Sequence, residues 1–146
     1  MNVVIDRLMA AVNAHDLDGL SALFHREYDS RQPAHPGRAF VGGSQVRANW
    51  EAMFDGVPDF RAELGRMVQD GDTTWCEWAW LGTRTDDQPF EMRGVALFRI
   101  TGDVIVAGSL YMEAVEVEPV DIAQAVEGLS GHRPARAPDG ESSNPS

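Results

Sequence analysis

The sequence predicts an α+β fold in which three N-terminal helices cover one face of a curled antiparallel sheet. Apolar residues recur at helical spacing up to about residue 56, and from Phe60 onward they alternate with polar residues, as in half-buried strands. Short turn sequences separate the alternating segments, which indicates antiparallel hairpins because parallel strands need long crossover connections. Helices followed by a run of strands are typical of α+β domains.

Three helical segments are expected before residue 57, each with a polar residue placed to cap its start: Asn2, Asp16 and Ser44. The apolar residues at helical spacing are, in order, Val4, Leu8, Met9 and Val12; Leu17, Leu20, Leu23 and Phe24; and Val46, Trp50, Met53 and Phe54. Residues 31–43 contain two prolines and three glycines, which predicts a loop between the second and third helices.

The sheet is expected to have about four long strands plus a short one, and the four long strands follow residue 57. The first begins at Phe60, and the others lie at about 73–84, 90–100 and 104–117. Turn signals separate them at Asp70-Gly71-Asp72, Asp86-Asp87-Gln88-Pro89 and Gly102-Asp103. Consecutive strands joined in this way predict an antiparallel meander.

The amino-acid composition argues against several classes of binding partner. The net charge is −11 in 146 residues, which argues against nucleic acid and against an anionic membrane surface, because both need a basic patch. No stretch reaches the roughly 18 apolar residues needed to cross a bilayer, and no N-terminal signal segment is evident, so we expect a cytoplasmic protein. Cys76 is the single cysteine and the histidines are widely spaced, so neither a disulfide, a metal site nor a cofactor is expected.

The chain divides into three expected parts. Residues 1–118 contain the helices and strands of one domain. Residues 119–129 carry apolar side chains at helical spacing and are expected to form a short helix. Residues 130–146 are rich in Gly, Pro, Arg and Ser with hardly any large apolar residue, which is typical of a disordered tail.

Several stretches occur in an order typical of one family. They are Leu17-Asp18-Gly19-Leu20 before Leu23-Phe24, Gly42-Gly43, Val57-Pro58-Asp59-Phe60, Asp70-Gly71-Asp72, Trp78 to Thr83, Arg93 to Arg99, and Gly102-Asp103-Val104-Ile105. Over roughly residues 3–117 the chain resembles the SnoaL-like polyketide cyclase branch of the nuclear transport factor 2-like superfamily. Relatives of that branch include limonene epoxide hydrolase and ketosteroid isomerase.

The resemblance implies a cone whose sheet wraps around the three helices and whose mouth opens into a pocket. It also implies homodimers that pair through the outer face of the sheet. Strand alternation supports that expectation, because the outer face would carry many apolar side chains: Trp75, Ala79, Leu81, Val95, Leu97, Ala107 and Tyr111.

The resemblance implies that the opposite face of these strands lines the pocket. With two residues from the third helix, the expected ligand-binding set is Trp50, Phe54, Cys76, Trp78, Trp80, Met92, Ala96, Phe98, Gly108, Leu110 and Met112. Such a lining suits a flat apolar or aromatic ligand. The competing interpretation is that these side chains simply fill a solid core.

The chemistry that the resemblance implies is proton removal next to a carbonyl, which needs a carboxylate or histidine base. The family pattern places such groups at three positions, and this sequence differs at each: Ala96 replaces an acid, Leu110 a base and Arg31 a histidine. The polar groups that remain near the expected mouth are Tyr28, Asp29, Arg31 and His35, which are the candidate catalytic residues.

Three functions stay open at this point. One is a cyclase or isomerase of specialised metabolism with an unusual acid–base set. The second is a non-catalytic protein that binds or sequesters a small apolar ligand. The third is an epoxide hydrolase-like or hydratase activity. The missing acid–base residues favour binding, whereas the resemblance favours an enzyme.

Overall fold

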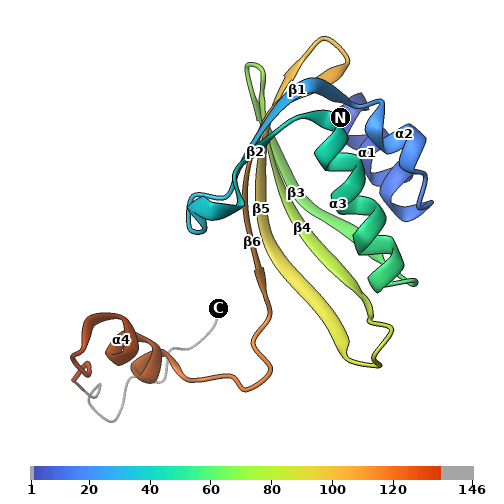
Figure 1. Ribbon diagram of the computed structural model, residues 1–146. Helices are drawn as coiled ribbons and strands as arrows, with labels where there is room; N and C mark the ends of the chain where they lie inside the picture. Colours follow the sequence, from blue (N-terminus) through green and yellow to red (C-terminus); the bar gives the residue numbers. More distant parts are fainter. Residues whose placement is uncertain (1, 136–146) are drawn as a thin grey trace, which may run out of the picture. The chain divides into compact units, whose positions relative to one another are not determined.

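The computed structural model describes residues 2–135, and the chain separates into two compact units, Met1–Val115 and Glu116–Ser146. The first unit contains three helices and a six-stranded sheet (Figure 1). The helices are α1 (Val3–Asn13), α2 (Leu17–Ser21) and α3 (Gly43–Gly56). The strands are β1 (Phe24–Arg31), β2 (Phe40–Val41), β3 (Arg61–Asp70), β4 (Thr73–Thr83), β5 (Pro89–Thr101) and β6 (Val104–Ala114).

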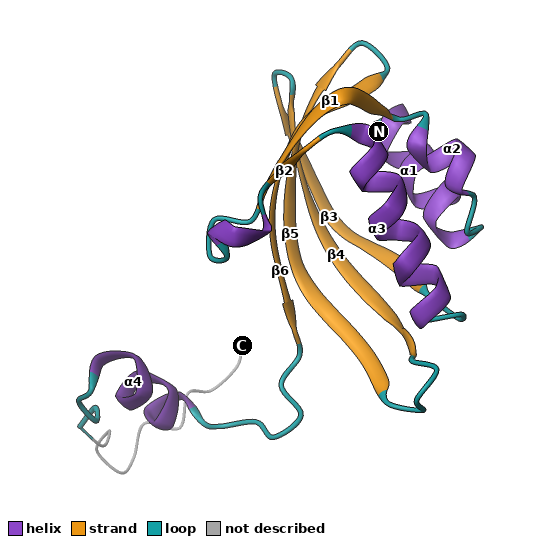
Figure 2. Cartoon of the chain, viewed as in Figure 1, coloured by secondary structure: helices purple, strands orange, loops and turns teal. Residues whose placement is uncertain are grey.

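The predicted α+β class and the four long strands are confirmed. Strands β3 to β6 form the expected antiparallel meander, and the sheet order is β2-β1-β6-β5-β4-β3. The three helices lie on one face of this curled sheet (Figure 2). Their apolar faces meet the sheet around fully buried side chains: Ile5, Leu8, Val12, Leu20, Phe60 and Ile105.

The prediction of a purely antiparallel sheet is wrong, because β1 pairs with β6 in parallel. Helical spacing places Leu23 and Phe24 in the second helix, but that helix ends at Ser21 and a strand begins at Phe24. The strand then extends as far as Arg31, where the sequence predicts the start of a loop. Parallel pairing of distant segments leaves no local turn signal in the sequence, so the pattern does not locate this strand. The sheet therefore has six strands rather than the four long and one short that the sequence predicts.

The helix starts follow the predicted caps in two cases out of three. The Asn2 side chain accepts a hydrogen bond from the Ile5 backbone N–H, and Asp16 accepts one from Gly19. Ser44 lies inside the first turn of α3 instead, because that helix begins at Gly43 and has no side-chain cap.

A paired amide joins the first helix to the edge of the sheet. The Asn13 side chain accepts a hydrogen bond from the Ala62 N–H at 2.7 Å and donates one to the Ala62 carbonyl at 3.1 Å. Nearby, the His15 ring lies 2.8 Å from the Phe60 carbonyl and stacks on Phe54. These contacts fix the α1–α2 connection against the beginning of β3.

One change of strand register affects which residues face inward. The pairing of β5 with β6 shifts between Arg99 and Ile100, so Ile105 is fully buried and Val106 is only partly so. Strict alternation back from the predicted inward residues Gly108, Leu110 and Met112 would place Val106 inward as well, and the irregularity in the ladder explains the difference.

The second unit contains the short helix α4 (Ile122–Ser130). Asp121 and Gln124 form a reciprocal capping box at its start, and Gly131 ends it in the left-handed conformation. Most of the tail expected over residues 130–146 lies outside the described residues, which end at residue 135. None of the helices in the described range has the length and apolar character needed to cross a membrane.

Candidate functional site

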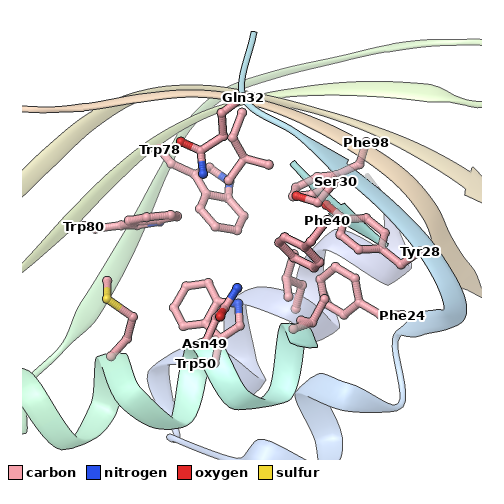
Figure 3. A pocket seen from close by; sticks show the side chains of 14 residues that line it. Phe24, Tyr28, Ser30, Gln32, Phe40, Asn49, Trp50, Trp78, Trp80 and Phe98 are labelled. Carbon is pink, nitrogen blue, oxygen red and sulfur yellow. The ribbon is translucent and has the colours of Figure 1, made fainter. Parts of the chain in front are cut away.

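A cavity of about 180 Å³ lies between the helices and the inner face of the sheet, within the first unit. Figure 3 shows side chains of α3, β1 and β4 converging on it. The fourteen residues that line it are Leu8, Phe24, Tyr28, Ser30, Gln32, Phe40, Val46, Asn49, Trp50, Met53, Trp78, Trp80, Phe98 and Leu110. We call this space the central cavity.

Aromatic rings form most of the cavity wall. Trp50 from α3 and Trp80 from β4 meet edge to face, with ring centroids 5.4 Å apart. Farther along the wall, the ring centroids of Trp78 and Phe98 are 5.9 Å apart. Rings in this arrangement present flat apolar surfaces at fixed angles to the cavity.

Five of the eleven predicted ligand-binding residues line the cavity: Trp50, Trp78, Trp80, Phe98 and Leu110. The other six lie elsewhere on the inner side of the fold. Cys76, Ala96 and Met112 are buried in the core, and Met92 packs against it. Phe54 stacks on His15, and Gly108 lies beneath Tyr28.

Tyr28 is the one predicted catalytic residue that reaches the cavity. It projects from the inner face of β1, is 2% exposed, and packs edge to face against Phe24. Burial raises the pKa of its phenol from 10.0 to about 12, with a smaller opposing effect from the Ser30 hydroxyl. The phenol is therefore protonated at neutral pH and can donate a hydrogen bond.

Asp29 and Arg31 alternate with Tyr28 on β1 and point to the other face. Their side chains are 43% and 69% exposed and lie 3.4 Å apart as an ion pair. His35 lies beyond the end of the strand, where its Nε2 is 2.7 Å from the Glu113 carboxylate. The positions of these three residues do not support the prediction that they sit at the pocket mouth. Asp29 and Arg31 alternate with the inward-facing residues of β1 and therefore point outward, and His35 is paired with Glu113.

Reasoning from sequence missed the neutral polar residues of the cavity: Ser30, Gln32 and Asn49. Two of them lie on or just after β1, which the sequence pattern does not predict as a strand. The alternation of Tyr28 and Ser30 with Asp29 and Arg31 is a signal that could reveal both the strand and its inner face.

Two buried donors on residues that line the cavity have no hydrogen-bond partner among the described residues. They are the indole Nε1–H groups of Trp78 and Trp80, whose residues are 4% and 7% exposed. Trp78 lies close enough to the neighbouring Cys76 thiol to lower its pKa slightly, against the larger effect of burial, but a thiol sulfur is at most a weak hydrogen-bond acceptor. Buried polar groups are nearly always paired in proteins, so these two indole groups are exceptions within the core.

The lining contains no carboxylate, imidazole, lysine or arginine. Ala96 and Leu110, which stand where the resemblance leads us to expect an acid and a base, pair directly across β5 and β6. Within the described residues there is also no cluster of three His, Cys, Asp or Glu side chains suited to a metal ion. The arrangement can enclose an apolar ligand and donate hydrogen bonds to it.

The curled mixed sheet with helices on one face has the nuclear transport factor 2-like fold. The chain belongs to the SnoaL-like domain family, whose model matches residues 5–108. No curated protein sequence matches significantly.

Solved structures with the same fold agree with this assignment. A ketosteroid isomerase-like protein from Catenulispora acidiphila, crystallised with trimethylamine, has a TM-score of 0.66 at 16% identity, covering 75% of this chain and 84% of its own. IdmH, a proposed polyketide cyclase from Streptomyces antibioticus, has a TM-score of 0.64 at 23% identity, covering 76% and 88%. A proposed SnoaL-like polyketide cyclase from Jannaschia has a TM-score of 0.65 at 17% identity, covering 75% and 83%. Likeness at these identities establishes the fold.

Proposed function

We propose that the protein binds a small, flat, largely apolar molecule in the central cavity and does not act on it by general acid–base catalysis. The observation that carries this proposal is the composition of the lining, in which aromatic and aliphatic side chains surround only neutral polar groups. Enclosed sites of this kind are typical of ligand pockets.

Catalysis of proton transfer requires a general base, and the lining of the central cavity does not provide one. A general base works best when its pKa lies near the pH of the reaction. Tyr28 is the one lining residue with a shifted pKa, and a phenol with a pKa of about 12 remains protonated at neutral pH. The carboxylate of Asp29, next to Tyr28 on β1, points to the opposite face and is paired with Arg31.

A cyclase or isomerase is the second candidate. The family and the proposed cyclases among its structural neighbours favour it. Within the cavity, the Tyr28 hydroxyl is a donor that would stabilise an enolate oxygen, as donors in such sites do. This reaction would need the substrate or water to supply the base. Epoxide hydrolysis or hydration has less support, because no lining carboxylate is present to hold a water molecule.

The proposed function is tested by filling the cavity. Leu110 lines it, whereas Leu97 lies on the other face of the sheet. We expect Leu110→Trp to abolish binding of a small bicyclic aromatic such as naphthalene, measured by quenching of intrinsic tryptophan fluorescence. Leu97→Trp is the matched control and should bind as the unmodified protein does. Equal binding by both variants would contradict the assignment of the cavity.

The same proposal predicts what the protein carries in its own host. Native mass spectrometry of protein purified from that host should show a retained small molecule that is lost in Leu110→Trp. If an isolated substrate were instead converted at the same rate by the unmodified protein and by Tyr28→Phe, the cyclase alternative based on Tyr28 would be excluded.

We also propose that two copies pair through the outer face of the sheet. The ladder places Val68, Trp75 and Leu97 in one row across β3, β4 and β5. Trp75 is 50% exposed and Val68 is 63% exposed in the single chain. Apolar surface of this kind on a sheet face is costly in water, and pairing would remove it.

A further inference from the structure

We propose that the central cavity is too short for a polycyclic ligand and accepts at most two fused rings, with Trp50 as the residue that sets this limit. This inference rests on the proposed binding function and adds the size class of the ligand and the residue that selects it. Its basis is the volume of the cavity together with the aromatic contacts that close both of its ends.

The volume of the cavity sets the first limit. It is about 180 Å³, whereas pockets for drug-sized ligands begin at about 300 Å³. An engineered protein cavity of about 150 Å³ binds benzene, which is a single ring. At the packing density of protein interiors, about 0.75, the central cavity holds roughly ten non-hydrogen atoms, as in two fused aromatic rings. A third ring must displace part of the wall or remain outside in water.

Trp50 and Trp80 close one end of the cavity. Their rings meet edge to face with centroids 5.4 Å apart. Behind them, the Phe60 ring lies 5.4 Å from that of Trp50 and 6.1 Å from that of Trp80. Phe60 is 2% exposed and is not among the lining residues, so the cavity ends at the two indole rings. Three rings in mutual contact leave no passage for a longer ligand.

Phe24, Tyr28 and Phe40 close the opposite end. The Tyr28 ring packs edge to face on Phe24 with centroids 4.9 Å apart, and it lies 6.2 Å from the Phe40 ring. Figure 3 shows these three side chains across the cavity from Trp80. Tyr28 has no room to retreat, because its hydroxyl already fills the space above Gly108. This end of the cavity is therefore fixed.

Trp50 is the wall residue that can be shortened while the sheet stays intact. It comes from α3 and is partly buried, whereas Trp80 is 7% exposed on β4, which pairs with a strand on each side. Shortening a large core side chain leaves a hole, because the surrounding structure relaxes only in part. Trp50→Leu should therefore add the volume of the lost ring to the central cavity and lengthen it.

The experiment compares quinoline with acridine, flat aromatic amines of two and three fused rings, in mildly alkaline buffer where both are uncharged. Affinities are measured by isothermal titration calorimetry for the full-length protein and its variants. The unmodified protein should bind quinoline more tightly, although acridine is the more hydrophobic molecule. We expect Trp50→Leu to raise the acridine-to-quinoline affinity ratio about tenfold, the gain expected when the apolar surface of one further ring is buried.

Phe54→Leu is the matched control. Phe54 lies one turn after Trp50 on α3 and packs against both Trp50 and Phe60, but it does not line the cavity. This variant removes a ring from the same aromatic cluster without opening the cavity, so the ratio should stay unchanged. Binding of quinoline shows that Trp50→Leu is folded. If that variant does not fold, Met53→Ala shortens another lining side chain of α3 and should also raise the ratio.

The outcomes distinguish the two proposals. If the unmodified protein binds acridine at least as tightly as quinoline, the size limit is overturned and the binding function stands. If it binds neither, the proposed function fails and the inference with it. An unchanged ratio in folded Trp50→Leu, or an equal rise in Phe54→Leu, would overturn the assignment of the limit to Trp50. A preference for quinoline that Trp50→Leu alone reverses or weakens supports both proposals.

Discussion

The hydroxyl of Tyr28 occupies the space above Gly108 where a β-carbon would lie. Tyr28 comes from β1 and Gly108 from β6, and these are the two strands that pair in parallel. The glycine is therefore needed for space rather than for backbone freedom, and it allows the phenol to reach the central cavity.

Gly108→Ala should displace Tyr28 and lower the free energy of unfolding by about 1–3 kcal/mol, the usual cost of overpacking a core. Chemical denaturation measures this change. The matched test is the double variant Gly108→Ala/Tyr28→Phe, in which the overlapping oxygen has been removed. We expect the alanine to cost clearly less when Tyr28→Phe is already present. An equal cost with and without Tyr28→Phe would show that the hydroxyl is not what excludes a side chain here.

Tyr28 should remain protonated in the folded protein at pH values where a free tyrosine ionises. Its pKa is raised from 10.0 to about 12, so the folded state holds this proton more tightly than the unfolded state does. The stability associated with the protonated phenol is therefore fully present below pH 10 and is lost as the pH rises toward about 12. Absorbance at about 295 nm across this range, with Tyr28→Phe subtracted, measures the titration. A midpoint near 10 in the folded protein would contradict the burial of the hydroxyl.

Cys76 should be inert in the folded protein. It is fully buried on the inner side of β4, and burial raises the pKa of its thiol to about 11, so almost none is thiolate at about pH 8. Reaction with Ellman's reagent should be negligible over minutes in buffer and should release one equivalent in guanidinium chloride. Rapid stoichiometric reaction of the folded protein would show that the core opens readily at this strand.

Replacing Trp75 by Glu should separate the proposed dimer. The substitution places a charge in the middle of the apolar row on the outer face, where its desolvation would oppose pairing. Sedimentation velocity should give a dimer for the unmodified chain and a monomer for Trp75→Glu. Val3→Glu, at an exposed apolar position on α1, is the control and should remain dimeric. A monomer in the unmodified chain would reject the proposed interface.

The sequence by itself determined the class of fold, the meander of four long strands and much of the inner face. Period-two alternation in β4 placed Cys76, Trp78 and Trp80 inward, and all three are buried. These features follow from the local pattern of apolar residues and turns, which a single chain displays directly. The sequence also predicts that Ala96 and Leu110 stand at positions where the resemblance implies an acid and a base.

Only the tertiary structure decided how β1 completes the site. The parallel pairing of β1 with β6 joins segments that are distant in the chain, and it alone brings Tyr28, Ser30 and Gln32 to the cavity while turning Asp29 and Arg31 away. The unpaired donors of Trp78 and Trp80 likewise became apparent only once their neighbours were placed. The sequence names Tyr28 as a catalytic candidate, but its role as a buried donor depends on the desolvation that the assembled cavity imposes.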